Sequence, residues 1–119
     1  METRAALAQW DDAAQRLTLT TPSQGVHVLH RLLCDNILKI PRERLRVVTE
    51  DVGGGFGPKL PPYPEQSLVC FAAMKLKRAV RWTQERTEHH LADTHARDLV
   101  ATAQLALDVP LAAAQFAEA

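Results

Sequence analysis

The sequence has 119 residues, and its 14 Lys and Arg balance its 14 Asp and Glu, so the formal net charge is +0. Hydrophobic residues make up 46% of the chain and charged residues 24%, which is typical of one small globular domain. The chain lacks the excess of like charge on which binding to nucleic acids and to membrane surfaces depends. We therefore expect neither nucleic acid nor a membrane among its partners.

The two cysteines, Cys34 and Cys70, indicate a reducing environment. Two thiols are too few for a four-cysteine zinc site or for the disulfide framework of a small secreted domain. The first residues show no charged region leading into an apolar one, and no apolar run approaches the ~18 residues of a membrane span. The sequence thus predicts a soluble, cytoplasmic protein.

Two short strands are predicted at the start of the chain, over residues 5–10 and 17–20, with a polar hairpin loop between them. From residue 26 to residue 40, apolar side chains recur at gaps of three and four, which predicts one helix. Pro41 ends this helix because proline cannot continue the hydrogen-bond pattern. A third short strand is predicted over residues 45–48.

The second half of the chain begins with a proline-rich stretch, after which residues 65–77 are apolar nearly all round. This pattern predicts a mostly buried helix. Further strands are predicted over residues 79–83 and 101–107, with a polar connection over residues 85–98 between them. The order of elements favours an α+β fold in which two helices pack on a mixed β-sheet.

The glycine loop, residues 53–59, follows the third strand and is the most informative stretch of the sequence. Three consecutive glycines let the backbone take positive φ and bring N–H groups close to a ligand oxygen or phosphate. The loop is not a Walker motif, because Lys59 follows Pro58 and Leu60 stands in place of Ser or Thr. It also lacks the final glycine of the dinucleotide fingerprint. A wide turn between a strand and a helix is the alternative interpretation.

Gln24 is a second candidate for ligand binding. It follows a predicted strand and precedes a predicted helix, where an amide side chain can point out of the end of a sheet toward a ligand. The alternative is a solvated loop residue, with Ser23 capping the helix.

Residues suited to catalysis or metal binding are otherwise scarce. Cys34 and Cys70 fall in apolar helical stretches, where a thiolate is disfavoured. His89, His90 and His95 invite a metal site, but on a helix the first two lie about 100° apart and the third lies near neither. The sequence therefore predicts no catalytic residue within this chain and does not favour a metal site at the histidines.

Five motifs occur in a fixed order along the chain: Pro-Ser-Gln-Gly-Val-His at 22–27, Val-Val-Thr-Glu-Asp-Val-Gly-Gly-Gly-Phe-Gly-Pro-Lys at 47–59, Tyr-Pro-Glu at 63–65, Ala-Val-Arg-Trp at 79–82 and Glu-Arg-Thr-Glu at 85–88. Together they resemble the molybdopterin-binding large subunit of the xanthine dehydrogenase, aldehyde oxidase and carbon monoxide dehydrogenase family, the molybdenum hydroxylases. The resemblance covers residues 1–108 and implies one module of a partial molybdopterin-binding domain. Residues 109–119 form a divergent, alanine-rich tail.

The resemblance implies a set of cofactor-binding residues. Gln24 corresponds to the family's glutamine that approaches the molybdenum without binding it directly. The molybdopterin is expected to pack against Gly54, Gly55, Phe56 and Gly57. The chemistry suits these roles, because a planar amide donates hydrogen bonds and glycine lets a ligand approach the backbone where a Cβ would collide.

The resemblance also implies a function. The chain would be part of an oxidoreductase that uses molybdopterin, in its cytosine dinucleotide form, to hydroxylate an aldehyde or a related small carbon centre, or to oxidise carbon monoxide. Its partners would be the rest of the molybdenum subunit and separate subunits that carry iron–sulfur clusters and FAD. Leu60 replaces the glutamate of purine-hydroxylating members, which makes a purine substrate less favoured. The alternative is an inactive, truncated paralogue that serves as a structural or interaction domain.

Overall fold

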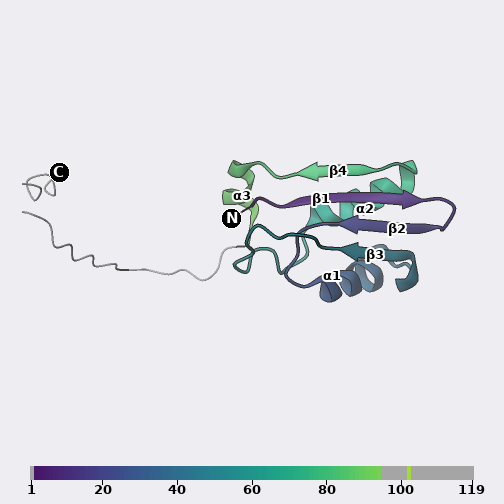
Figure 1. The fold of residues 1–119 in the computed structure, drawn as a ribbon, viewed down its shortest axis with the longest axis horizontal. Coiled ribbons are helices and arrows are strands. Elements are labelled where there is room, and N and C mark those ends of the chain that lie inside the picture. The colour runs from purple at the N-terminus through teal and green to yellow at the C-terminus, as the bar shows by residue number, and fades with distance from the viewer. Residues whose placement is uncertain (1, 95–101, 103–119) are drawn as a thin grey trace, which may run out of the picture.

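A mixed four-stranded sheet forms the centre of the computed structural model, which describes residues 2–94 and 102 (Figure 1). Its strands are β1 (Ala5–Asp11), β2 (Arg16–Thr20), β3 (Leu45–Val48) and β4 (Val80–Thr83), in the order β3-β2-β1-β4. β1 is antiparallel to both β2 and β4, whereas β2 and β3 run parallel. The four strands predicted over these residues are confirmed to within one residue at each end.

Alternation along the strands directs one face of the sheet into a hydrophobic core. Leu17 and Leu19 on β2 are fully buried, and Thr18 between them is only partly buried. Burial of each such leucine stabilises the fold by about 1.5–3 kcal/mol. The core comprises Ala6, Ala8, Leu17, Leu19, Leu29, Leu33, Cys34, Leu45, Val69, Cys70 and Ala73.

Two helices cover this face of the sheet, as the sequence predicted. α2 (Pro64–Leu76) contacts β1, β2 and β4, and α1 (Val26–Leu32) lies beside β3. The prediction that this helix is mostly buried is wrong. Its side toward the sheet is buried, but Leu68 is 63% exposed and Phe71 is 55% exposed, because no described element covers the opposite side.

The helix predicted over residues 26–40 has a different form. After Leu32 the chain continues as a π-helical turn, Leu33–Leu38, which ends at Lys39 in a left-handed conformation with φ 52°. A single π-helical turn, with its i→i+5 hydrogen bonds, is too short to change the apolar spacing of three and four residues from which the sequence predicts a helix. A short 3-10 turn, Arg42–Arg44, then leads into β3.

A third helix, α3 (Arg86–Ala92), occupies part of the segment predicted as a polar connection. It has no apolar stripe, which is why the sequence pattern gave no helical signal. Its first turn is held by the Glu88 carboxylate, which accepts the backbone N–H of Glu85 at 2.8 Å. The strand predicted over residues 101–107 and the tail at 109–119 lie outside the described residues.

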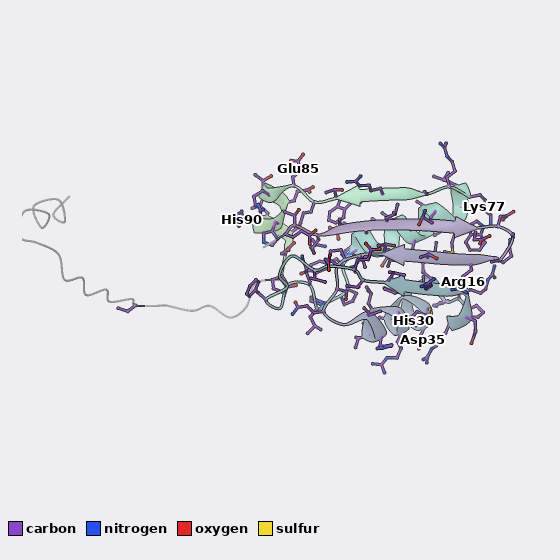
Figure 2. The ribbon with its side chains drawn as sticks, in the orientation of Figure 1. Arg16, His30, Asp35, Lys77, Glu85 and His90 are labelled. Atoms are coloured by element: carbon purple, nitrogen blue, oxygen red, sulfur yellow. The ribbon has the colours of Figure 1, made fainter. Side chains whose placement is uncertain are left out.

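Charged side chains lie at both ends of the sheet (Figure 2). Arg16 and Lys77 are near the β1–β2 hairpin, whereas Glu85, which caps the start of α3, and His90, within α3, lie at the other end. Lys77 pairs with Asp12 at 3.5 Å. Among residues 2–94, no helix is long and apolar enough to cross a bilayer.

Candidate functional site

The glycine loop joins β3 to the start of α2 and adopts conformations that require glycine at two positions. Gly54 has φ 79° and Gly57 has φ 96°, which are left-handed values that other residues rarely adopt. Phe56 between them also has positive φ, at 48°, and its side chain is 81% exposed. The loop therefore presents an aromatic ring to solvent on a left-handed stretch of backbone in which glycines occupy two of the three positive-φ positions.

Gln24 lies directly against the glycine loop. Its side-chain Oε1 accepts the backbone N–H of Gly57 at 2.9 Å, and its own backbone N–H donates to the carbonyl of Lys59 at 3.0 Å. A Cβ added to Gly55 would lie 2.3 Å from Cδ of Gln24. The structure thus brings together the glutamine and the glycines that the sequence singled out separately.

The parallel pairing of β2 and β3 explains this proximity. The carboxyl ends of parallel strands lie at the same edge of a sheet, so the segments that follow them meet there. Thr21, after β2, donates its backbone N–H to the carbonyl of Val48 at 3.0 Å, and the Thr49 hydroxyl donates to the carbonyl of Thr21 at 2.8 Å. These bonds extend the pairing to within a few residues of Gln24.

The site is rich in hydrogen-bond donors. Because Oε1 of Gln24 faces the Gly57 N–H, Nε2 is on the other side of the amide and carries two N–H donors. Within the part of the chain that the structure describes, the backbone N–H groups of Gly55 and Phe56 have no hydrogen-bond partner. A ligand that suits these groups carries oxygen or nitrogen acceptors.

Glu2 and Lys59 also belong to the site, although sequence reasoning did not find them in this role. The Lys59 side chain is fully buried, and its Nζ is 3.1 Å from Oε2 of Glu2. The same Oε2 accepts the backbone N–H of Gly53 at 3.0 Å. The Gly53 N–H and the Lys59 ammonium together hold the pKa of Glu2 below its ordinary value. Nothing in the sequence signals a contact between residues so far apart.

A second network supports the exit of the glycine loop. The Tyr63 hydroxyl donates to the carbonyl of Pro58 at 2.6 Å, and the guanidinium of Arg4 lies 3.4 Å from the centre of the Tyr63 ring. Arg4 is buried and pairs with Asp93 at 2.9 Å and with Glu65 at 3.2 Å. This network connects β1, α2 and the end of α3.

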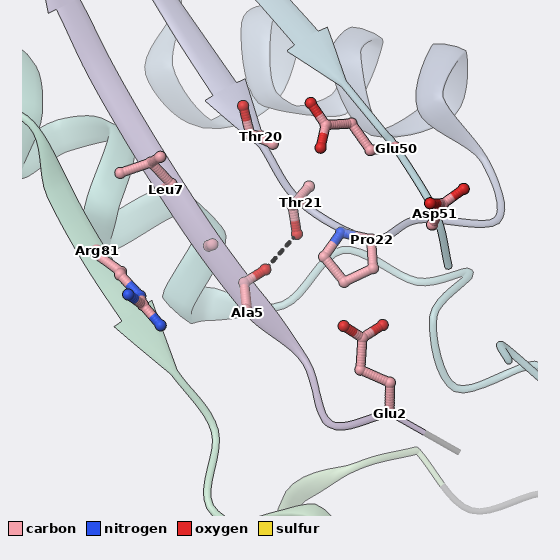
Figure 3. Close-up of a pocket in the computed structure, with 10 residues that line it drawn as sticks. Glu2, Ala5, Leu7, Thr20, Thr21, Pro22, Glu50, Asp51 and Arg81 are labelled. Atoms are coloured by element: carbon pink, nitrogen blue, oxygen red, sulfur yellow. Dashed lines mark hydrogen bonds between the residues drawn. The ribbon is translucent and has the colours of Figure 1, made fainter. Parts of the chain in front are cut away.

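A cavity of about 270 Å³ opens beside the first strand rather than over the glycine loop (Figure 3). Its polar lining includes Glu2, Glu50 and Asp51 on one side and Arg81 on β4. Gln24 and residues 54–57 do not line it. The described residues therefore provide one exposed side of a ligand site and not an enclosed pocket around Gln24.

Other candidate residues have structural roles. Burial raises the pKa of Cys70 to about 12 and also raises that of Cys34, which disfavours the thiolate at both positions. His89 pairs with Asp93 at 2.7 Å. Among the described residues, which exclude His95, no three His, Cys, Asp or Glu side chains are placed to hold a metal ion.

Comparison with known proteins identifies the family. The profile of the molybdopterin cofactor-binding domain matches residues 1–110. The nicotine 6-hydroxylase large subunit of Paenarthrobacter nicotinovorans is 36% identical over 106 residues, which are 89% of this chain and 13% of that protein. The carbon monoxide dehydrogenase large chain of Hydrogenophaga pseudoflava is 34% identical over 106 residues, again 89% of this chain and 13% of the relative.

A solved structure shows the same fold. The crystal structure of quinoline 2-oxidoreductase from Pseudomonas putida 86 superposes with a TM-score of 0.78 and 40% identity, covering 82% of this chain and 12% of that one. The chain thus spans about an eighth of the length of the proteins that it matches. The chain belongs to the molybdopterin cofactor-binding domain family and is similar to one segment of the large subunits of molybdenum-dependent oxidoreductases.

Proposed function

We propose that this chain forms one wall of the molybdopterin site of a molybdenum hydroxylase. In this proposal Gln24 lies beside the molybdenum without binding it directly, and Gly54, Gly55, Phe56 and Gly57 pack against the molybdopterin. The observation that carries the proposal is the contact of Gln24 with Gly55 and Gly57, because it joins the two predicted parts of the site.

The residues present fit such a cofactor. Beside Gly57 the space is open, since an added Cβ would meet no atom within 4 Å. The Gln24 amide and the N–H groups of Gly55 and Phe56 supply donors for the pterin nitrogens and oxygens. The bound cofactor would supply the redox chemistry. The residues of this chain would bind and orient it, and the fixed Gln24 amide would donate a hydrogen bond at the metal end.

The proposed reaction is the hydroxylation of an aldehyde or a related small carbon centre, or the oxidation of carbon monoxide. The names of the relatives support this range, since they include a nicotine hydroxylase, a carbon monoxide dehydrogenase and an aldehyde oxidoreductase. Leu60, which is 52% exposed, provides an apolar side chain where purine-hydroxylating members have a glutamate.

The proposed partners are the rest of a molybdenum subunit and separate iron–sulfur and FAD subunits, in the cytoplasm. Several relatives are named as a large subunit or large chain, which supports a multi-subunit assembly. The cofactor form that we propose is the cytosine dinucleotide. The substrate would contact residues supplied by these partners as well as this chain.

The test is co-expression with candidate partner subunits, followed by measurement of molybdenum in the purified complex. We expect molybdenum with the unchanged chain and its loss with Gln24→Ala and with Phe56→Ala. Gln9→Ala, at another exposed glutamine, is the matched control and should retain the metal. Molybdenum at background level with every partner would overturn the proposal.

A second candidate function is a catalytically inactive structural or interaction domain. The exposed apolar side of α2 favours it, since Leu68, Phe71 and Leu76 are each more than half exposed. Such surfaces commonly mark contacts with other proteins. This function predicts that Gln24→Ala leaves partner binding unchanged and that neither form of the complex contains cofactor.

A further inference from the structure

We infer that Glu2 and Lys59 are positioning residues for Gln24, because together they clamp the two ends of the glycine loop against which the Gln24 amide is fixed. This inference rests on the proposed function for its consequence at the cofactor. The clamp itself is a property of the free chain and is testable without any cofactor.

One carboxylate oxygen of Glu2 contacts both ends of the glycine loop. Oε2 of Glu2 accepts the Gly53 N–H at 3.0 Å and lies 3.1 Å from Nζ of Lys59. The backbone N–H of Glu2 also donates to the Gly53 carbonyl at 2.7 Å. The first and last residues of the glycine loop are thus held by one residue near the start of β1.

The far end of the loop in turn holds Gln24 at two points. The Lys59 carbonyl accepts the Gln24 backbone N–H at 3.0 Å, and the Gly57 N–H donates to its side-chain Oε1 at 2.9 Å. Residues 57–59 therefore determine both where Gln24 lies and which way its amide faces. A movement of Lys59 would displace Gln24 directly through the Lys59 carbonyl and indirectly through Gly57, two residues earlier in the loop.

Because the Lys59 side chain is buried, its ammonium needs the Glu2 carboxylate as a counter-charge to stay in place. The Lys59 side chain has no exposed surface, whereas that of Glu2 is 51% exposed. A buried ammonium without a counter-charge is strongly disfavoured, so loss of the Glu2 charge should drive Lys59 toward water. Replacement of Lys59 by an apolar residue of similar size removes the buried charge and leaves Glu2 solvated.

The first experiment measures hydrogen exchange by NMR in the full 119-residue chain. Glu2→Gln should speed exchange of the Gly57 N–H about tenfold, which corresponds to the loss of one charge-assisted hydrogen bond. Exchange at Leu19 in the sheet should stay unchanged, which shows that the fold is intact. Glu50→Gln removes an exposed carboxylate that lines the same cavity as Glu2, and it should have no effect. Unchanged exchange at Gly57 in Glu2→Gln would overturn the clamp.

A second variant keeps the test decisive if Glu2→Gln does not fold. Lys59→Met should also speed Gly57 exchange, and adding Glu2→Gln to it should cause little further change, because the two residues act as a pair. Independent, additive effects would contradict the inference. Lys59→Arg, which keeps the cation, should restore part of the protection.

Molybdenum content of the co-expressed complex separates the two proposals. If the clamp positions Gln24 for the cofactor, Glu2→Gln should reduce molybdenum relative to the unchanged complex. Full molybdenum despite fast Gly57 exchange would overturn the role of the clamp toward the cofactor. If the unchanged complex holds no molybdenum, the proposed function fails, while the exchange data still decide whether the clamp exists.

Discussion

The side-chain Oε1 of Gln24 accepts the backbone N–H of Gly57 at 2.9 Å, although the two residues are 33 positions apart in the sequence. This bond fixes the plane of the Gln24 amide. It also shows why a glutamine and a glycine loop that look unrelated in the sequence act as one unit.

Gly55→Ala should displace Gln24 with little loss of stability. The added Cβ would lie 2.3 Å from Cδ of Gln24, an exposed side chain that can move away, and Gly55 does not have a positive φ. Gly57 would then lose its acceptor, so its N–H should exchange faster in NMR while the melting temperature changes little.

Gly57→Ala is the matched comparison for that variant. Here the added Cβ meets open space, but the φ of 96° is unfavourable for alanine and costs about 1–2 kcal/mol. We expect lower stability in urea unfolding without direct displacement of Gln24. If Gly55→Ala and Gly57→Ala have the same effects on both measurements, the steric interpretation of Gly55 is wrong.

Glu2 should make stability depend on acid pH. Its pKa is lowered in the folded chain by the Gly53 N–H and by Lys59, so the unfolded chain binds more protons there. The contribution is therefore complete above the ordinary glutamate pKa and is lost as pH falls through the lowered value. Unfolding free energies from about pH 5 downward should fall less steeply for Glu2→Gln than for the unchanged chain. Parallel curves would contradict this prediction.

Arg4→Met should destabilise the fold strongly. Arg4 is 3% exposed, and its removal leaves the buried Asp93 carboxylate without the guanidinium that donates to it at 2.9 Å. Breaking a buried pair from one side costs about 3–5 kcal/mol. Urea unfolding measures the loss, and Arg42→Met, in an exposed pair with Asp35, is the control that should change stability little. A similar effect of both substitutions would show that burial is not the cause.

Cys34 and Cys70 should resist alkylation in the folded chain. Both are buried, and burial raises the pKa of Cys70 to about 12, so almost no thiolate forms near neutral pH. Mass spectrometry after iodoacetamide treatment should find both thiols unmodified in buffer and modified in urea. Rapid labelling of Cys70 in buffer would show that the core around α2 opens readily.

The sequence predicted those parts of the fold that rest on local periodicity. Alternation and strand-forming residues predicted the strands, apolar spacing predicted the helix that begins at Val26, and a continuous apolar stretch predicted α2. It did not reveal α3, because that helix has no apolar stripe and its first turn is held by a polar contact, the Glu85 N–H with the Glu88 carboxylate. It also overstated the burial of α2, since apolar residues such as Phe71 do not by themselves show whether anything covers them.

The sequence identified residues of the candidate site but not how they contact one another. The motifs around Gln24 and Gly55 identified both, and family membership is confirmed by comparison. Their contact depends on the parallel pairing of β2 with β3, which no local pattern encodes. The Glu2–Lys59 pair was missed for the same reason, because it joins residues that are 57 positions apart.

The register of β2 against β3 determines where Gln24 lies along the glycine loop. Leu17 pairs with Leu45 and Leu19 with Val47, so the core fixes how far each strand extends toward the shared edge. A slip of one residue would move Gln24 about 3.3 Å along the glycine loop and would turn Leu17 and Leu19 out of the core. Leu17 and Leu19, although buried in the core, thereby fix the position of the Gln24 amide relative to the glycine loop.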